Sequence, residues 1–263
     1  MRSVELKLSK TIGENIMDNT KYIALSRQMG LWKQMDIVSN NMANMNTSGY
    51  KQDDAVFSSY LVKTENAAGF GKVPVYFTHD FGEFTDFAEG AFVQTGNTFD
   101  LALKGDGFFS IETDQGERYT KKGQFMLDAD GKLVTADGDI VLSENNEPFF
   151  FAPGEKEISF AVNGDVSTEN GVIGRLKIAK FADNQKLLKI ANTMFENVAG
   201  NAMQVNSGDA SVAQGYVEKS NVEAIAEMTK MIKLQRSYEY VQQMIDEEHD
   251  RVSNTIAAYA QLA

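Results

Sequence analysis

The sequence predicts an α+β protein in which long N- and C-terminal helices form a coiled-coil-like helical part, with an antiparallel β-domain inserted between them. Near each end lies a long stretch with almost no Gly or Pro, in which apolar residues recur at helical spacing. Between these stretches, short segments alternate apolar and polar residues and are separated by Gly- and Asp-rich turns. A run of strands between two helices is typical of α+β architecture.

The N-terminal helix is expected from Met17 to about Asn46. This stretch holds no Pro and a single Gly, and its apolar residues form a stripe on one face. The helix should end in an Asn-rich segment followed by Thr47-Ser48-Gly49, because these residues favour helix termini and turns. Residues 1–16 are expected to be a disordered extension or a mis-assigned start. Acidic residues interrupt any apolar region there, so no cleavable signal peptide is expected.

After this helix, residues 52–65 are expected to be an irregular or short helical linker, and Asn66–Gly71 a flexible joint. Strand patterns separated by hairpin turns such as Gly105-Asp106-Gly107 and Asp137-Gly138 continue to about Phe181. A polar, Asn-rich return loop should follow. The predicted boundaries are therefore 1–16 for the extension, 17–65 for the N-terminal helix and linker, 66–181 for the β-domain, 182–214 for the return loop and 215–263 for the C-terminal helix.

The C-terminal helix has the clearest pattern. After Gly215 it contains neither Gly nor Pro. Its larger residues recur at alternating spacings of three and four, from Met231 to Tyr259, which is a heptad-like seam with two polar interruptions. A helix of this length, on the order of 60 Å, needs a partner along its side. The N-terminal helix is the only comparable stretch, so the two are expected to pair.

Composition excludes several functions. The chain of 263 residues has a net charge of −12, which makes nucleic acid a poor partner. Residues 1–60 carry seven basic and six acidic side chains, and residues 215–263 carry five and eight, so most of the negative charge lies between them. There is no Cys, and no apolar run is long enough for a membrane span.

Patterns that could indicate catalysis have simpler explanations. Ser48 and Lys51 match the S-x-x-K spacing of penicillin-recognising enzymes, but the accompanying S-D-N and K-T-G motifs are missing. His79 and His249 are far apart and have no second ligand at metal-binding spacing. We therefore expect no catalytic residue, cofactor or metal site.

Two segments at opposite ends of the chain resemble the signatures of flagellar rod, hook and hook-associated proteins. Ser39–Lys51 (SNNMANMNTSGYK) resembles the N-terminal signature, and Gly215–Val222 (GYVEKSNV), continued by residues 227–239, resembles the C-terminal one. Phe87–Gly90 and residues 95–109 extend the resemblance into the middle of the chain. Within this family, residues 22–29 and 246–251 are most similar to proximal-rod proteins, with distal-rod proteins as the alternative.

The resemblance implies a structural rod subunit that polymerises through its terminal helices and builds the drive shaft for motility. Its implied partners are other rod subunits, copies of itself and, in transit, the flagellar type III exporter, with no nucleic acid and no membrane insertion. Its implied location is the periplasmic rod of the flagellar basal body. The candidate assembly interface combines an apolar seam with Asn amides that either contact neighbours or cap the helix: Leu25, Met29, Trp32, Met35, Asn40, Asn41, Asn44, Asn46, Ile232, Leu234, Tyr238, Val241 and Ile245. The remaining alternative is a secreted adhesin or a peptidoglycan-acting protein.

Overall fold

The computed structural model describes residues 2–65, 72–152, 154–155, 157–191, 193–198, 203–204 and 210–261. Side chains are described from residue 22 to 56 and from 82 onward within these ranges, except at 203–204 and 261. The chain divides into two compact units. The helical unit comprises Met1–Asn40, Asp53–Phe84 and Ile225–Ala263, and the β-unit comprises Asn41–Gln52 and Thr85–Ala224. The expected flexible joint at residues 66–71 lies outside the described residues.

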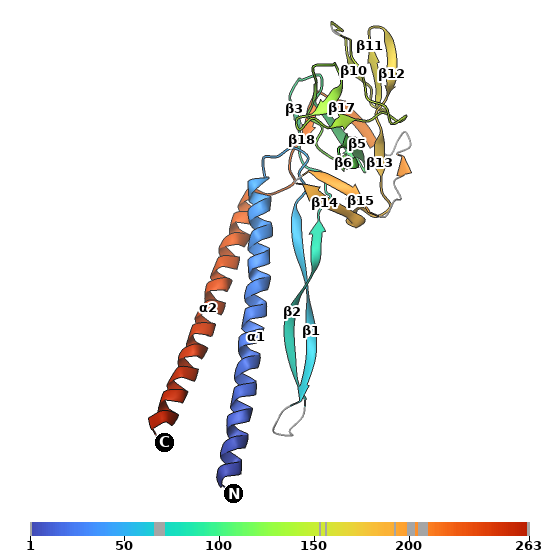
Figure 1. Cartoon of the computed structure of the whole chain (residues 1–263). Coiled ribbons are helices and arrows are strands. Elements are labelled where there is room, and N and C mark those ends of the chain that lie inside the picture. Colours follow the sequence, from blue (N-terminus) through green and yellow to red (C-terminus); the bar gives the residue numbers. More distant parts are fainter. Residues whose placement is uncertain are drawn as a thin grey trace. The chain divides into compact units, whose positions relative to one another are not determined.

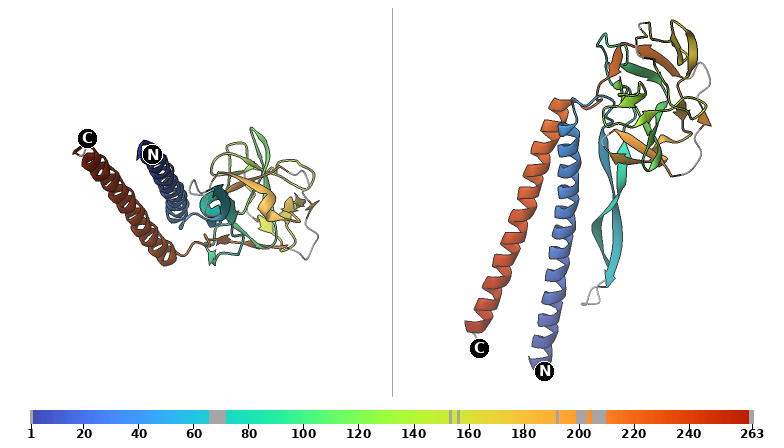
Figure 2. Two further views of the ribbon diagram at one scale, coloured as in Figure 1. Left: turned by 90° about the horizontal axis from the view of Figure 1, so that it is seen from below. Right: turned by 45° about the horizontal axis from the view of Figure 1, so that its top comes forward.

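The helical unit is built from two α-helices and a long hairpin (Figures 1 and 2). Its elements are α1 (Arg2–Ala43), whose last residues enter the β-unit, β1 (Asp53–Glu65), β2 (Lys72–Thr85) and α2 (Ala224–Gln261), with β1 and β2 forming a two-stranded sheet. Charged and amide side chains connect these elements. Lys33 of α1 pairs with Glu83 of β2 at 2.7 Å, Lys230 of α2 pairs with Asp54 of β1, and Gln28 of α1 donates to Gln242 of α2 at 2.8 Å.

The coiled-coil-like pairing predicted for the two helices is wrong, although an α+β fold is present. In a coiled coil the seam residues would be buried between the helices, whereas Met29 and Trp32 are 66% and 65% exposed and Ile232 is 52% exposed. The buried apolar residues among the described part of α1 are Ala24, Leu31, Ile37 and Val38, none of which belongs to the predicted seam. Apolar periodicity shows that a helix face needs a partner, but it does not say which surface provides it.

The chain after the first helix also differs from expectation. Residues 53–65, expected as an irregular or short helical linker, form strand β1. Val56, Phe57, Tyr60 and Val62 are β-branched or aromatic and suit a strand. Their spacing of three and four residues matches the helical period rather than the alternation of a strand, so spacing alone favoured a short helix.

The β-unit is organised around an antiparallel sheet of nine strands among the described residues. Its strands are β5 (Phe108–Thr113), β6 (Gly116–Thr120), β7 (Phe125–Leu127), β8 (Leu133–Thr135), β9 (Ile140–Val141), β13 (Ile178–Lys180), β14 (Leu187–Ala191), β15 (Met194–Asn197) and β16 (Met203–Gln204). The order is β14-β15-β6-β5-β9-β8-β7, and β13 pairs with both β5 and β16. A 3₁₀ turn, Asn184–Lys186, precedes β14.

Smaller sheets complete this unit. β10 (Ser159–Phe160), β11 (Asp165–Thr168) and β12 (Gly171–Arg175) form a three-stranded sheet. Two further pairs join early strands to late ones: β3 (Phe92–Gln94) pairs with β18 (Tyr216–Glu218), and β4 (Leu101–Gly105) pairs with β17 (Ala210–Gln214). Strands of the expected return loop, residues 182–214, are thus part of the sheets, because their backbone groups complete the pairing of earlier strands.

The core of the β-unit lies between these sheets. Its main cluster collects fully buried side chains from early and late strands, including Leu101, Leu103, Phe109, Ile111 and Val212. A second cluster contains Phe108, Tyr119, Phe181 and Phe195, whose rings meet edge to face at centroid distances of 4.8 to 5.7 Å. Such ring pairs add specific geometry to apolar burial. Val212 in the main cluster shows that the late strands help to bury the early ones.

Candidate functional site: the buried junction of the two terminal segments

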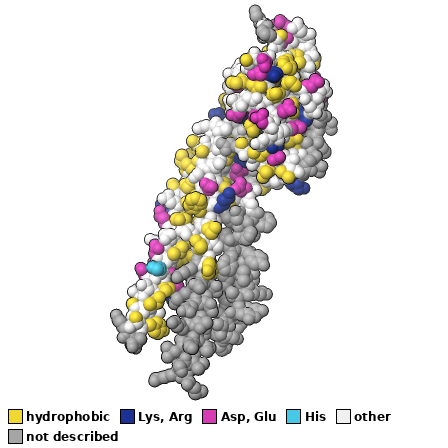
Figure 3. All heavy atoms as spheres, viewed as in Figure 1, with side chains coloured by type: hydrophobic (Ala, Val, Ile, Leu, Met, Phe, Trp, Pro, Cys, Tyr) yellow, Lys and Arg dark blue, Asp and Glu magenta, His cyan; other side chains and the backbone are white. Residues whose placement is uncertain are grey.

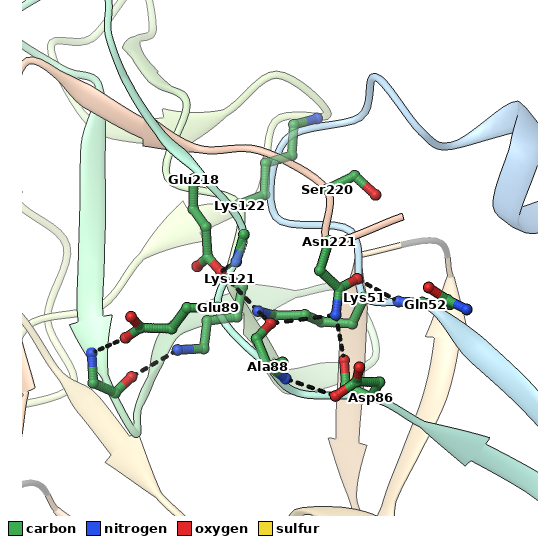
Figure 4. A network of polar contacts seen from close by, with 12 residues as sticks. Lys51, Gln52, Asp86, Ala88, Glu89, Lys121, Lys122, Glu218, Ser220 and Asn221 are labelled. Atoms are coloured by element: carbon green, nitrogen blue, oxygen red, sulfur yellow. Dashed lines mark hydrogen bonds and ion pairs between the residues drawn. The ribbon is translucent and has the colours of Figure 1, made fainter. Parts of the chain in front are cut away.

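The two segments that resemble a family signature meet inside the β-unit at a buried ion pair (Figure 4). Lys51 Nζ lies 2.7 Å from Glu218 Oε1, and the two side chains are 1% and 0% exposed. Lys51 comes from the segment after α1, and Glu218 is the last residue of β18, 167 positions later. Burial of both charges makes each dependent on the other, because a buried charge without a partner is strongly unfavourable.

Backbone groups of a third segment, around Ala88 and Gly90, bind the ion pair, and a backbone hydrogen bond joins the two terminal segments directly. Lys51 Nζ also donates to the carbonyl oxygen of Ala88 at 2.6 Å, and the backbone N–H of Gly90 donates to Glu218 Oε1 at 2.9 Å. The backbone N–H of Gly49 donates to the Glu218 carbonyl oxygen at 2.9 Å. The carboxylate Oε2 of Glu218 is buried with no hydrogen-bond partner among the described residues.

The side-chain amide of Asn221 forms further hydrogen bonds between backbone segments close to the ion pair (Figure 4). Its Oδ1 accepts from the backbone N–H of Gln52 at 2.8 Å, and its Nδ2 donates to the carbonyl oxygens of Asp86 and Ala88 at 2.8 and 3.2 Å. One amide therefore satisfies three backbone groups from two other segments. An amide with one acceptor and two donor hydrogens is suited to this role.

Tyr50 anchors the end of α1. Its side chain is fully buried, and its hydroxyl donates to Asn41 Oδ1 at 3.0 Å. Lys189 of β14 lies over the Tyr50 ring at 4.0 Å from the centroid, and its Nζ donates to the Lys51 carbonyl oxygen at 2.9 Å. A cation over an aromatic face is attracted by the ring's quadrupole, so the largest sheet and the first signature segment are joined at this point.

A second buried lysine lies close to the ion pair. Lys121 is 4% exposed, and its Nζ donates to the carbonyl oxygen of Gly105 at 2.9 Å. Burial lowers the pKa of Lys121 from 10.5 to about 8; the charge of Glu218 opposes this shift, and the charge of Lys51 adds to it. Burial dominates because the ammonium loses its hydration. The junction therefore holds two lysines near a single fully buried carboxylate.

Two glycines allow the backbone segments to approach this closely. A Cβ added at Gly90 would overlap the carbonyl oxygen of Lys219, and one at Gly49 would overlap the backbone of Lys122. Gly49 also has φ +72°, which favours glycine. The backbone N–H of Lys219 donates to the Ala91 carbonyl oxygen at 2.9 Å, which continues the β3–β18 pairing beyond the strands.

This arrangement is suited to holding segments together rather than to catalysis. Oε1 of Glu218 and the two lysine ammonium groups are occupied by one another and by backbone groups. Among the residues that the structure describes, no group of three or more His, Cys, Asp or Glu could hold a metal ion. None of the described helices has the length and apolar character to cross a membrane.

The predicted apolar interface residues on the helices range from exposed to buried. On α1, Leu25, Met29 and Trp32 are exposed, and Met35 is half-buried. On α2, Ile232 is exposed and Leu234 is buried. Three residues of the same seam, Tyr238, Val241 and Ile245, are half-buried. Met29, Trp32 and Tyr238 line one hollow of about 320 Å³, so the structure brings part of the predicted set together.

The four predicted asparagines divide into two groups. Asn41 and Asn44 are buried, and they accept hydrogen bonds from Tyr50 and from Thr47 Oγ1 in their own chain. Asn40 and Asn46 are exposed. The buried pair is therefore used in closing the turn after α1.

Sequence reasoning missed the buried network itself. Lys51, Glu218 and Asn221 all lie in the signature-like segments, but their residue types and spacing indicate no structural role, and no sequence pattern points to Lys121. One signal was available: a lysine in one segment and a glutamate in the other could neutralise each other. Nothing in the sequence, however, indicates that these two side chains are buried.

Models of three protein families match this chain, one near its N-terminus, one in its middle and one near its C-terminus. Residues 22–51 match a family model described as "Flagella basal body rod protein". Residues 102–171 match one described as "Flagellar hook protein FlgE/F/G D1 domain", and residues 213–257 one described as "Flagellar basal body rod FlgEFG protein C-terminal". The first and last of these matches include the residues that form the buried ion pair.

Curated relatives are similar over most of their length. "Flagellar basal-body rod protein FlgF" of Caulobacter vibrioides is 37% identical over 88% of this chain and 93% of the relative. The protein of that name from Rhizobium meliloti is 31% identical over 91% and 97%. "Flagellar basal-body rod protein FlgG" of Agrobacterium fabrum is 34% identical over 78% and 86%.

These matches give the class of protein, which is a structural subunit rather than an enzyme. The chain belongs to the flagellar basal-body rod protein family. It is a structural subunit of the bacterial flagellar basal-body rod, beside other rod subunits, and serves motility. Among the relatives, those called FlgF have identities of 29 to 37% over at least 85% of the chain.

Proposed function

We propose that this chain is a FlgF-type subunit of the proximal rod, which polymerises through its terminal helices with copies of itself and with rod subunits of the FlgG, FlgB and FlgC types. The observation that carries this proposal is the exposed apolar surface of the two helices. Tyr22, Met29 and Trp32 on α1 and Ile225 and Ile232 on α2 are each more than half exposed. Soluble monomers rarely expose such contiguous apolar strips, which mark sites of association.

Within this proposal, the apolar residues Leu25, Met29, Trp32, Met35, Ile232, Leu234, Tyr238, Val241 and Ile245 contribute the contacts between subunits. The exposed amides of Asn40 and Asn46 can also reach neighbouring backbones, while Asn41 and Asn44 hold the end of α1. Export through the flagellar type III exporter and assembly in the periplasmic part of the rod belong to the same proposal. A FlgG-type place in the distal rod is the second candidate, because FlgG proteins are also similar over most of this chain.

The location is tested by mass spectrometry of hook–basal bodies purified from the source organism. Peptides from this chain, recovered in the proximal fraction after the distal rod is sheared off, would support the FlgF-type assignment. Recovery only with the distal rod would favour the FlgG type. Absence from basal bodies, with the protein free in the periplasm or medium, would overturn the proposed role.

The interface is tested by replacing Trp32 with Ser. Because Trp32 is 65% exposed, the Trp32→Ser variant should keep the monomer's stability within about 0.5 kcal/mol. The concentration needed for assembly, measured by sedimentation, should rise by about tenfold or more. Phe150→Ser, which removes a 53% exposed aromatic ring from the β-unit, is the matched control and should assemble normally. Equal loss of assembly in both variants would contradict the proposal.

A further inference from the structure

The helix α2 carries a second apolar surface, which shares only Ile232 with the predicted seam. Met228, Ile232, Tyr240 and Met244 are 47%, 52%, 73% and 45% exposed, and with Arg236 they occupy every fourth position. Residues spaced by four form one continuous ridge on a helix, and such ridges are the units that interlock when helices pack. We name these five residues the α2 ridge. Figure 3 shows hydrophobic side chains in series along this helix.

The α2 ridge points away from the face of α2 that its own chain covers. The buried residues of α2 are Leu234 and Glu227, at 9% and 2% exposure. Ile232 and Leu234 are two residues apart, which is about 200° around a helix. The ridge and the covered face therefore lie on opposite sides, so one chain alone leaves the ridge in solvent.

The helix α1 carries a comparable uncovered surface. Tyr22, Leu25, Met29 and Trp32 are 62%, 49%, 66% and 65% exposed, and the exposed Asp36 continues the line by one more turn. We name these five residues the α1 stripe. It lies opposite the buried line of Ala24, Leu31 and Val38. Part of the stripe borders the hollow of about 320 Å³ that Tyr238 also lines, so it offers a recess as well as an apolar surface.

We infer that the α2 ridge of one subunit packs on the α1 stripe of a second copy of this chain. The charges on the two surfaces favour ridge on stripe over a contact of ridge on ridge. The ridge has the guanidinium of Arg236 at its centre, and the stripe ends in the carboxylate of Asp36. A two-fold symmetric contact of ridge on ridge would bring two guanidinium groups together at the crossing, and like charges across an interface are repulsive.

The inference rests on the proposed function and makes it specific. Each chain presents one ridge and one stripe on different surfaces, so the contact is head-to-tail and both surfaces remain available at the ends of a growing chain of subunits. Contacts of this kind form rings or open helical filaments, whereas a self-complementary surface stops at a dimer. A rod requires the open form.

Site-specific cross-linking tests the contact, because the natural chain has no Cys. Two full-length variants, Met29→Cys and Ile232→Cys, are assembled separately and as an equimolar mixture, and are treated with a short bis-maleimide. The mixture should give covalent dimer at several times the yield of either variant alone. Met29→Cys mixed with Val172→Cys is the control, since Val172 is 72% exposed but lies in the β-unit.

The outcomes separate this inference from the proposed function. Normal sedimentation of the assembled mixture without covalent dimer would overturn the contact and leave polymerisation intact. Efficient dimerisation of Ile232→Cys alone would also overturn it, in favour of ridge on ridge. If the natural chain forms no assembly at any concentration, the proposed polymerisation is contradicted as well.

A charge exchange provides a second, independent readout. Arg236→Asp and Asp36→Arg should each raise the concentration needed for assembly by about threefold or more, because each places like charges across the contact. Combining both changes in one chain should recover most of this loss, and raising the salt concentration should reduce the effect of either change. If the double variant assembles no better than the single ones, these two residues do not face each other.

Discussion

At the scale of single residues, the buried carboxylate of Glu218 determines how the chain's two terminal segments are held. It accepts hydrogen bonds from Lys51 and from the backbone of Gly90, and its charge acts on Lys121. Neither lysine is solvated, so this carboxylate is the main compensation for two buried ammonium groups. Removing either the carboxylate or the Lys51 ammonium group should therefore lower the stability of the junction.

A double-mutant cycle tests this dependence. Lys51→Met and Glu218→Leu should each lower the free energy of unfolding by about 3 to 5 kcal/mol, since each leaves an unpaired buried charge. The double variant should lose clearly less than the sum of the two, because no charge of the pair remains. The measurement is urea unfolding of the full chain at pH 7.

The control for this cycle is Lys132→Met. Lys132 lies 3.7 Å from the exposed carboxylate of Asp130, and exposed pairs contribute little. Its effect should stay below about 1 kcal/mol. Additive losses in the cycle would show that Lys51 and Glu218 act independently, contrary to the geometry.

Lys121 predicts a pH dependence of stability. Its pKa is lowered to about 8 in the folded chain by burial, while the unfolded chain keeps the ordinary value of 10.5. Between these values the unfolded state binds more protons, so the stability contributed by this group rises as the pH increases from about 8. From pH 7 to 9.5 the gain is on the order of 2 kcal/mol relative to a Lys121→Met variant.

The pH range for this measurement is set by a second group. Burial, with the charge of Glu117, raises the pKa of Tyr119 to about 12. That group stabilises the folded chain fully below pH 10 and loses its contribution as the pH rises towards 12. Unfolding at pH 7 and 9.5 therefore isolates Lys121. An unchanged difference between the natural chain and Lys121→Met across this range would show that the amine is not desolvated.

At the scale of elements, the late strands β17 and β18 close sheets that begin more than a hundred residues earlier. β17 pairs with β4 over five residues, from Gln214 opposite Leu101 to Ala210 opposite Gly105. β18 pairs with β3, and the pairing continues to Lys219 and Ala91. Residues that lead into α2 are thus built into the β-unit.

Gly90 tests the closure at β18. The Gly90→Ala variant should lose about 2 kcal/mol or more of unfolding free energy, because its Cβ would overlap the Lys219 carbonyl oxygen. Gly174→Ala is the matched control, since a Cβ there would meet only the Phe149 ring at 3.4 Å, an ordinary contact. Thermal unfolding of both variants gives the comparison. Equal midpoints would mean that the backbone at Gly90 can move aside at little cost.

At the scale of the whole molecule, the two units differ in how much they bury. The β-unit has two apolar clusters with many side chains below 5% exposure. In α2, Leu234 is the one apolar side chain counted as buried among the described residues. Helices gain most of their stability from packing an apolar face, so the helical unit should be the less stable part of a dilute monomer.

Hydrogen exchange followed by mass spectrometry tests this difference. In dilute monomer, amides of α2 should exchange at least about tenfold faster than those of β5 and β6. On assembly, protection of α2 should increase while that of the β-unit stays the same, because subunit contacts would cover the exposed apolar residues. Equal protection of both units in the monomer would contradict this expectation.

The sequence by itself determined the presence of two terminal helices, a β-rich middle and the family, because these depend on local periodicity, turn residues and long family-specific sequence motifs. It placed residues such as Trp32 and Ile232 on apolar faces, since spacing alone decides which residues share a helix face. It also identified the segments that contain Lys51 and Glu218, but not their contact.

Only the tertiary structure decided which surfaces those faces meet. The spacing of the apolar residues predicted a coiled coil, but Met29, Trp32 and Ile232 of the predicted seam remain exposed. On α2 the other predicted interface residues are buried or half-buried. The pairing of β18 with β3, and of Lys51 with Glu218, joins residues more than a hundred positions apart. Such contacts depend on how all the strands fill the available pairing positions, and no local pattern encodes that choice.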